Sequence, residues 1–263
     1  MNISNNWRVL PLAIADQQSH IARSESLLQA IQPEDAAVLS WSMAATDGLV
    51  LGFSQKPDTL NPAMRAAASL PVYHRRAGGT AVLVGRHLLG LDVVLPAHHP
   101  LALPDIVESY RWLGEVWVAA LQHLGVTTRA VPPDEAHAQR DLLKHAATRE
   151  REAILRRACY GALSPYEVVV GQRKVVGLDM IRRRQGSLLQ AGVLLHWETE
   201  TLACWLGHTP AEQDTLRGGL LERAVGLDTL AGRIIAPEEV IAAFELVIGS
   251  LPPRPDNVYN VQK

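Results

Sequence analysis

Apolar residues recur at helical spacing in several stretches of the chain. The clearest stretch runs from Ile106 to Leu124, where they return at three- and four-residue steps, the spacing of one face of an amphipathic helix. Asp105 is placed to cap its start and Gly125 to end it. A capping box that begins at Thr209 marks a later helix. The same reasoning predicts further helices over residues 13–31, 64–69, 141–157, 209–225 and 238–248.

Short apolar runs between turn residues predict strands. Two of them form a hairpin, because Val168–Val170 and Val175–Val176 flank the dipeptide Gly171-Gln172. Glycine at the first central position supplies the positive φ that a two-residue turn needs. The hairpin places Lys174 on a strand directly after the turn, beside an apolar pair. Other predicted strands and apolar runs cover residues 36–41, 49–51, 72–75, 81–84, 88–95 and 188–195.

Strands mixed with helices, with a hairpin in the middle of the chain, predict an α/β or α+β protein. The 263 residues suit one large domain, and 48% of them are hydrophobic, which is enough for a sizeable core. No internal repeat or linker divides the sequence. We therefore expect a single domain over residues 1–263, with residues 209–250 as a helical C-terminal part and a loose tail at 252–255.

Composition excludes several classes of protein. A net charge of −2 gives no reason to expect nucleic acid as a partner. Two cysteines are too few for a disulfide scaffold and suit a reducing compartment. No apolar run reaches the roughly 18 residues of a membrane span, and the N-terminus lacks the basic flank and apolar core of a signal peptide. We expect a cytoplasmic protein that binds neither nucleic acid nor a membrane.

One glycine-containing segment has the composition of an anion-binding loop. It reads Arg75-Arg76-Ala77-Gly78-Gly79-Thr80-Ala81. The two glycines let the backbone approach a ligand closely, and neighbouring amides can face an anion. It is not a P-loop, because no Gly-Lys-Ser or Gly-Lys-Thr follows. The simpler interpretation is a turn that ends a strand, with solvated arginines.

Lys174 and Cys159 are the other candidates for chemistry. A strand lysine beside a turn is usually solvated; the functional alternative is a cation that polarises an acyl carbonyl or binds a phosphate. A free cysteine is usually a small buried hydrophobe. Because Cys159 lies between two arginines and a turn, the alternative is a thiol of lowered pKa that acts as a nucleophile. Cys204, in an apolar run, is predicted to be core, and no histidine pair has metal-ligand spacing.

Taken in order, these segments resemble the lipoate–protein ligase and octanoyltransferase family, which shares its catalytic domain with biotin protein ligases. The segment Val72–Val82 is similar to the family's RRxxGGGAV loop, Arg173–Gly177 to its RKVxG strand, and Leu189–Gly192 to its LQHG element. The stretch from Cys159 to Val168 is similar to the region that carries the nucleophile in the cysteine-dependent octanoyltransferases.

The resemblance implies a mixed β-sheet flanked by helices, of the class II aminoacyl-tRNA synthetase and biotin ligase type. The glycine-containing loop and the lysine strand would frame one elongated pocket with an apolar tunnel for an acyl chain. Lys174 and Cys159 would be catalytic, and no metal site is implied. The implied substrate-binding residues are Arg75, Arg76, Gly78, Gly79, Thr80, Ala81, Gly177, Asp179, Gln190 and Gly192.

The implied activity is attachment of an octanoyl or lipoyl group to a lysine of a lipoyl-domain or GcvH-like carrier protein. A transferase would take octanoate from acyl carrier protein as a thioester on Cys159. An ATP-dependent ligase would instead use ATP and magnesium, and would hold an acyl-adenylate with Lys174 and the Arg75–Thr80 loop. A non-catalytic relative that binds the carrier, and a biotin ligase, are further alternatives. None of the enzyme routes implies a tightly bound cofactor.

Four positions depart from the family pattern. Thr80 replaces the third glycine of the loop, and Val84 and Ala191 stand where the family has histidines. Asp179 replaces a small residue and puts a carboxylate beside the expected anion site. Three roles for it stay open: repelling a phosphate, pairing with an arginine, or contacting the incoming amine.

Overall fold

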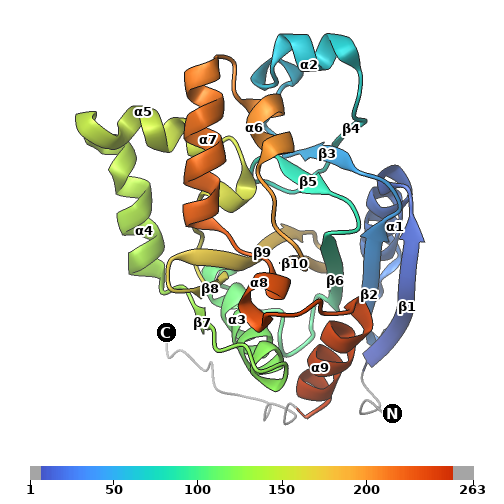
Figure 1. Ribbon diagram of the computed structural model, residues 1–263. Helices are drawn as coiled ribbons and strands as arrows, with labels where there is room; N and C mark the ends of the chain where they lie inside the picture. Colours follow the sequence, from blue (N-terminus) through green and yellow to red (C-terminus); the bar gives the residue numbers. More distant parts are fainter. Residues whose placement is uncertain (1–6, 251–263) are drawn as a thin grey trace, which may run out of the picture.

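The computed structural model describes residues 7–250 and shows two sheets with helices around them (Figure 1). The strands are β1 (Trp7–Ala15), β2 (Ala37–Ala44), β3 (Gly48–Leu51), β4 (Val72–His74), β5 (Val82–Val84), β6 (Leu88–Pro96), β7 (Arg129–Ala130), β8 (Val168–Val170), β9 (Arg173–Arg182) and β10 (Gly186–Leu194). The helices are α1 (Gln17–Ala30), α2 (Pro62–Ala67), α3 (Ile106–His123), α4 (Pro133–Asp141), α5 (Ala146–Leu155), α6 (Glu200–Leu206), α7 (Pro210–Arg223), α8 (Leu227–Ala231) and α9 (Pro237–Gly249).

The larger sheet has seven strands in the order β1-β2-β6-β10-β9-β8-β7. Strands β1 and β2 run parallel, and the other neighbours run antiparallel. A second sheet has the order β4-β3-β5. The predicted α/β (α+β) fold, with a mixed sheet flanked by helices, is therefore confirmed. The predicted tail at 252–255 lies outside the described residues.

An aromatic cluster closes one face of the large sheet. Trp41 on β2 meets Phe244 on α9 edge to face, with 5.5 Å between ring centroids, and Trp117 on α3 lies 4.5 Å from the same phenyl ring. Such pairs stabilise beyond their buried area. Figure 1 places α3 and α9 together at the lower end of the molecule. Helix α1 packs on the opposite face, where its Leu28 clusters with Val38, Val94 and Leu188 of the large sheet.

The predicted helix over 13–31 was wrong at its start. Residues Trp7–Ala15 form β1, which pairs with β2, and the helix begins only after Asp16. The Asp16 side chain accepts a hydrogen bond of 2.9 Å from the backbone N–H of Ser19, which is the role of an N-cap. The predicted helix therefore included residues 13–15, which are the last residues of this edge strand.

Two other predictions needed correction. The helix predicted over 141–157 starts too early, because Asp141 ends α4, residues Leu142–Lys144 form a 3-10 turn and His145 is extended, so that α5 begins only at Ala146. Cys204, predicted to be core, lies on α6 with intermediate exposure, and its thiol donates to Glu200 at 3.2 Å. Helices α4, α6 and α8 were not predicted.

The central hairpin was predicted correctly. Gly171 has a φ of +60°, and Val170 pairs with Arg173 across the turn. Strand β9 then runs ten residues through the middle of the sheet, between β10 and β8. Lys174 thus stands at the start of a long, paired strand whose backbone is held on both sides.

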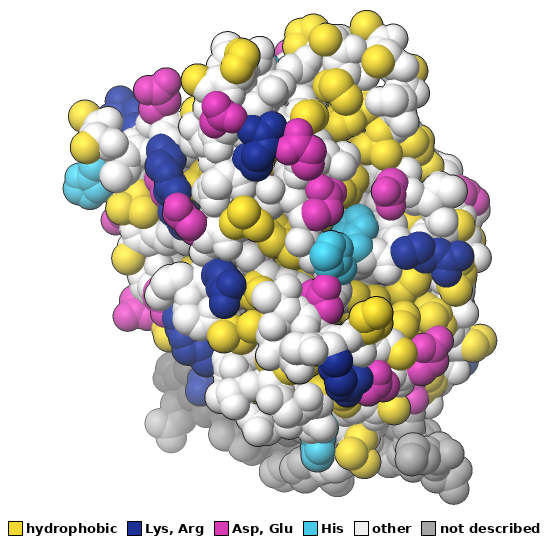
Figure 2. Space-filling view, in the orientation of Figure 1, with side chains coloured by type: hydrophobic (Ala, Val, Ile, Leu, Met, Phe, Trp, Pro, Cys, Tyr) yellow, Lys and Arg dark blue, Asp and Glu magenta, His cyan; other side chains and the backbone are white. Residues whose placement is uncertain are grey.

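The surface drawn in Figure 2 places basic side chains next to acidic ones over the upper helices. Ion pairs account for part of this arrangement. Arg157 contacts Glu212 on α7 at 2.5 Å, and Arg217 on α7 contacts Glu200 on α6 at 2.6 Å. Between residues 7 and 250, none of the helices combines the length and apolar character needed to cross a lipid bilayer.

Candidate active site

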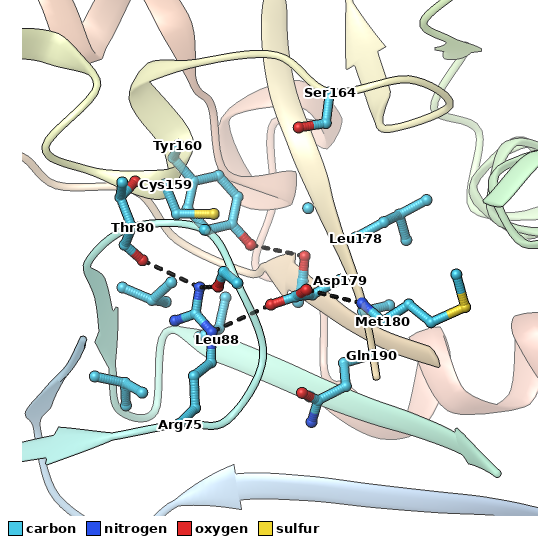
Figure 3. A pocket seen from close by; sticks show the side chains of 18 of the residues that line it. Arg75, Thr80, Leu88, Cys159, Tyr160, Ser164, Leu178, Asp179, Met180 and Gln190 are labelled. Carbon is cyan, nitrogen blue, oxygen red and sulfur yellow. Dashed lines mark hydrogen bonds and ion pairs between the residues drawn. The ribbon is translucent and has the colours of Figure 1, made fainter. Parts of the chain in front are cut away.

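A cavity of about 790 Å³ opens against the face of the large sheet that α1 covers. The glycine-containing loop, the start of β9, β10 and the Cys159 segment all contribute to its wall (Figure 3). Gly78, Gly79 and Lys174 line this same cavity, so the loop and the lysine strand converge as the family resemblance implied. Much of the remaining wall is apolar and includes Ile21, Val50, Val82, Leu88, Ile181 and Leu188.

Arg75 folds the glycine-containing loop and ties it to β9. Its Nη2 donates to the carbonyl oxygens of Gly78 at 2.8 Å and Thr80 at 3.1 Å. Its Nε donates to Asp179 Oδ2 at 3.2 Å, and Figure 3 shows the arginine reaching toward that carboxylate. Gly79 has a φ of +77°, a conformation that favours glycine. Of the three roles left open for Asp179, pairing with an arginine is the one observed.

Lys174 is not solvated, because only 1% of its side chain is exposed. Its Nζ lies 2.7 Å from Glu167 Oε2 and donates to the carbonyl oxygen of Cys159 at 2.9 Å. The ammonium also lies 5.4 Å from the centroid of the Tyr160 ring. Burial raises the pKa of Glu167, whereas Lys174 and two backbone N–H groups lower it. The cation is thus held in one position by a buried partner.

Cys159 reaches the cavity on a 3-10 turn that pairs with the loop. Its backbone N–H donates to the carbonyl oxygen of Ala81 at 2.8 Å, so the thiol segment and the glycine-containing loop form one unit. In Figure 3 the sulfur of Cys159 is drawn over the Tyr160 ring. The expectation of a lowered thiol pKa was wrong. Burial raises the pKa of Cys159, and the opposing charges of Lys174 and Arg75 do not outweigh burial.

Three glycines leave part of the cavity floor without side chains. Gly90, Gly192 and Gly177 are direct partners on β6, β10 and β9. Tyr160 packs on Gly177 and Gly192, and its hydroxyl donates to the carbonyl oxygen of Gly192 at 2.7 Å. A Cβ at Gly192 would lie 2.8 Å from that hydroxyl oxygen, so a larger residue would displace Tyr160. Gly177 and Gly192 thus make room for the Tyr160 ring on the sheet.

Asp92 is a buried carboxyl in the cavity wall whose hydrogen bonds indicate a bound proton. Ser24 Oγ lies 2.5 Å from Asp92 Oδ2 and 2.9 Å from the carbonyl oxygen of His20. Gln190 donates to Asp92 Oδ1 at 2.8 Å. One hydroxyl has a single hydrogen, so both contacts of Ser24 are satisfied only when Asp92 donates one of them. Burial likewise raises the pKa of Asp92, and a neutral acid keeps this wall free of charge.

Asp92→Asn is expected to raise the Tm at pH 8 by a few degrees, because asparagine offers a donor to Ser24 without a charge to bury. A carboxyl whose pKa is raised in the folded state stabilises the fold fully only below its unfolded pKa of about 3.9. That contribution to stability is lost as the pH rises through the pKa that the carboxyl has in the folded state. Thermal melts at pH 5 and pH 8 test this, with Asp92→Ala as the control that removes the hydrogen bonds. An increase in Tm for Asp92→Asn that is smaller at pH 8 than at pH 5 would contradict this expectation.

The structure places nearly all predicted site residues in one cavity. Ala81 is the exception, since it lies buried behind the loop and takes part through its backbone. Arg76 lies among the lining residues and pairs with Glu25 at 2.8 Å. The predicted residues that line the cavity are Arg75, Arg76, Gly78, Gly79, Thr80, Cys159, Lys174, Gly177, Asp179, Gln190 and Gly192. Between residues 7 and 250, no group of three or more His, Cys, Asp or Glu side chains is arranged to hold a metal ion.

Sequence reasoning did not single out three residues that shape the site. Glu167 is the buried partner of Lys174, Tyr160 packs on two glycines of the floor, and Asp92 stands in the wall. A signal existed for Glu167, because a lysine placed between apolar strand residues needs a nearby carboxylate if it is buried. Nothing local distinguished Asp92, whose partners come from α1 and β10.

The comparisons with known proteins agree with this geometry. The lipoyl protein ligase A/B catalytic domain family matches residues 16–248. The chain belongs to this family. An octanoyltransferase LipM of Exiguobacterium sibiricum is 30% identical over 242 residues, which cover 90% of this chain and 84% of that protein. An octanoyltransferase LipM of Lysinibacillus sphaericus is 28% identical over 246 residues, which also cover 90% of this chain and 84% of that protein. The chain is therefore an enzyme of the octanoyltransferase and lipoate–protein ligase family.

Solved structures of this family share the fold. A bi-partite lipoate protein ligase studied with its E2 lipoyl domain, from Thermoplasma acidophilum, has a TM-score of 0.70 at 18% identity, over 91% of this chain and 80% of that one. A lipoate-protein ligase A bound with ATP has a TM-score of 0.67 at 18% identity, over 91% and 82%. At this level of identity the likeness concerns the fold alone.

Proposed function

We propose that this enzyme transfers an octanoyl group from a thioester donor, such as octanoyl-acyl carrier protein, to a lysine of a lipoyl-domain or GcvH-like carrier. Cys159 holds the group between the two steps. The observation that carries the proposal is the meeting of the Cys159 thiol, the Lys174 ammonium and the glycine-containing loop in one largely apolar cavity. Relatives named octanoyltransferase, aligned over most of the chain, support it.

In the first step the sulfur of Cys159 attacks the carbonyl carbon of the donor thioester. The new carbon–sulfur bond forms, the donor's carbon–sulfur bond breaks, and the donor sulfur leaves with the proton that the Cys159 thiol gave up. In the second step the neutral amine of the carrier lysine attacks the same carbonyl carbon. The amide forms, the bond to Cys159 breaks, and a proton from the amine returns to the thiol.

Both steps place negative charge on the carbonyl oxygen, and the site offers donors for it. The Lys174 ammonium has three N–H donors, of which the described residues engage two, through Glu167 and Cys159. Within residues 7–250, the backbone N–H groups of Gly79 and Thr80 donate to no acceptor. Donors that are held in place before the reaction and away from bulk water stabilise the developing charge more than the same donors do in water.

The Arg75–Asp179 pair favours transfer from a thioester over ATP-dependent ligation. An acyl-adenylate would put a phosphate beside the loop, where Asp179 already neutralises Arg75 at 3.2 Å. Burial raises the pKa of Asp179 while Arg75 lowers it, and an ionised carboxylate there repels a phosphate. A thioester substrate carries no charge at the reacting carbonyl and meets no such repulsion.

Acyl-donor experiments distinguish the routes. The enzyme is mixed with a lipoyl domain and either octanoyl-acyl carrier protein without ATP, or octanoate with ATP and magnesium, and the masses of both proteins are measured. We expect carrier modification and an octanoyl adduct on the enzyme with the first donor alone. Modification that requires ATP and survives Cys159→Ala would establish the ligase route. Carrier binding without a mass change under either condition would contradict both proposed routes.

A further inference from the structure

Strand β9 has a free edge that lies inside the cavity. Its outer neighbour β8 reaches only as far as Val176, so within the described chain residues 177–182 pair with β10 alone. The part of this segment from 177 to 181 lines the cavity. An unpaired strand edge presents main-chain groups that can pair with another chain. The cavity therefore offers a ligand main-chain hydrogen bonds as well as side chains.

Two carbonyl oxygens of this edge are open to a ligand. The N–H groups of Leu178 and Met180 point away from β10, since they donate to Glu167 Oε1 at 3.3 Å and to Asp179 Oδ1 at 2.8 Å. In an antiparallel strand the carbonyl of a residue points to the same side as its N–H. The carbonyl oxygens of Leu178 and Met180 thus face the free edge, where they accept no hydrogen bond from residues 7–250.

Tyr110 on α3 adds a free hydroxyl to the same part of the cavity. Its neighbour Ser109 accepts from Arg182, at the end of β9, at 2.9 Å, which places α3 beside the free edge. The Tyr110 hydroxyl makes no hydrogen bond within the described chain and retains accessible surface. Burial and the charges of Asp179 and Glu167 raise the pKa of Tyr110, so the hydroxyl keeps its proton and can donate it to a ligand.

The free edge begins next to the proposed nucleophile. The tyrosine that follows Cys159 packs on Gly177, where a Cβ would lie 3.5 Å from its ring. Glu167 connects the edge to the cation of the site, because its Oε2 pairs with Lys174 Nζ at 2.7 Å and its Oε1 accepts from the N–H of Leu178. A chain that extends from a thioester at Cys159 can therefore lie along the edge of β9.

We propose that the free edge of β9 and the Tyr110 hydroxyl bind the amide-bearing arm of the thioester donor. This inference rests on the proposed acyl transfer. The phosphopantetheine arm of an acyl carrier protein contains two amides, each of which offers an N–H to a main-chain carbonyl and a carbonyl oxygen to a hydroxyl. The octanoyl group has no N–H, and the carrier lysine enters through an apolar stem of four methylenes. The donor arm is thus the reactant group that matches the acceptors of Leu178 and Met180.

Two thioesters isolate the amide N–H groups. Octanoyl-pantetheine is compared with an analogue in which ester oxygens replace both amide N–H groups, and acylation of Cys159 is followed in single turnovers by intact mass. The wild-type enzyme is expected to react about 3- to 10-fold faster, at limiting donor, with the amide compound, which is the range of a neutral hydrogen bond.

Two tyrosine variants test the hydroxyl. Tyr110→Phe should slow the amide compound by a similar factor and the ester compound by less, because an ester oxygen is the weaker acceptor. The ratio of the two rates should therefore fall. Tyr166→Phe is the matched control, since its hydroxyl belongs to a residue outside the cavity wall and donates to Glu108 at 2.7 Å. This control should keep the wild-type ratio.

Several results would overturn the subsite while leaving transfer intact. They are equal wild-type rates with both compounds, an unchanged ratio in folded Tyr110→Phe, and an equal fall of the ratio in Tyr166→Phe. Acylation by octanoyl-acyl carrier protein but by neither small compound would show that the arm is not bound by itself, and would overturn it too. If Tyr110→Phe does not fold by circular dichroism, the wild-type comparison decides.

Two further outcomes separate this inference from the proposed function. An unchanged acylation ratio in Tyr110→Phe, with slowed transfer to the carrier, would assign the free edge to the main chain of the carrier and overturn the arm as its ligand. If Cys159 accepts octanoate from neither small compound nor octanoyl-acyl carrier protein, the transfer and the subsite are both overturned.

Discussion

Replacing Cys159 by alanine is expected to lower octanoyl transfer by about 10³-fold or more, because the reaction loses the atom that holds the acyl group between its two steps. Cys159 lies in the cavity wall, and its backbone carbonyl oxygen accepts a hydrogen bond of 2.9 Å from Lys174 Nζ. Carrier modification and the enzyme-bound octanoyl adduct should disappear together. Both are measured by intact mass in the same reaction, with octanoyl-acyl carrier protein as donor.

The chain offers a matched control in Cys204, which lies on α6 outside the cavity wall. Cys204→Ala should keep both the adduct and the transfer. Because burial raises the pKa of Cys159, wild-type acylation should also accelerate as the pH rises toward the pKa of the thiol. An adduct that survives in Cys159→Ala, or is lost in Cys204→Ala, would contradict the assignment of the nucleophile.

Lys174→Met is expected both to abolish transfer and to destabilise the fold. Without the ammonium, the Glu167 carboxyl stays buried at 2% exposure with no cation to pair with, which typically costs about 3–5 kcal/mol. The reaction also loses a donor to the developing oxyanion, a loss typically worth about 10²–10³-fold in rate. Thermal melting and acylation of Cys159 are measured on the same preparation.

A double variant separates the two effects of this substitution. Lys174→Met with Glu167→Gln removes the unpaired charge, so a large part of the lost stability should return while the activity does not. The amide oxygen of glutamine can accept from one of the two backbone N–H groups, of Ser164 and Leu178, that now face the carboxylate. Recovery of transfer along with stability would show that Lys174 serves only to hold the fold.

Much of the fold was predictable because its signals are local. The stripe of apolar residues between capping positions predicted α3 within one residue of its end, and Gly171 predicted the turn from β8 to β9. The first strand was missed because an edge strand with mixed burial does not alternate strictly. Helix α4 was missed because only one of its residues, Ala136, is buried, which leaves little apolar periodicity to read.

The candidate site was predictable only in part. The loop and the lysine strand are continuous segments, so their residues could be named, and the structure brings them to one cavity. The Asp179–Arg75 pair joins residues 104 positions apart, and the Asp92–Ser24 pair joins residues 68 positions apart. Contacts at such separations depend on how strands are ordered in the sheet, which local patterns do not specify.

By itself, the sequence determined that Lys174 follows a tight turn on a strand, that a diglycine bend lies upstream, and that a thiol stands between them. Turn and strand preferences act over a few neighbouring residues, so these features needed no knowledge of the rest of the chain. Only the tertiary structure decided that Lys174 is buried against Glu167, that the pKa of Cys159 is raised rather than lowered, and that burial raises the pKa of Asp92. Burial and charge pairing depend on which distant segments pack together, and these set the chemistry of each group.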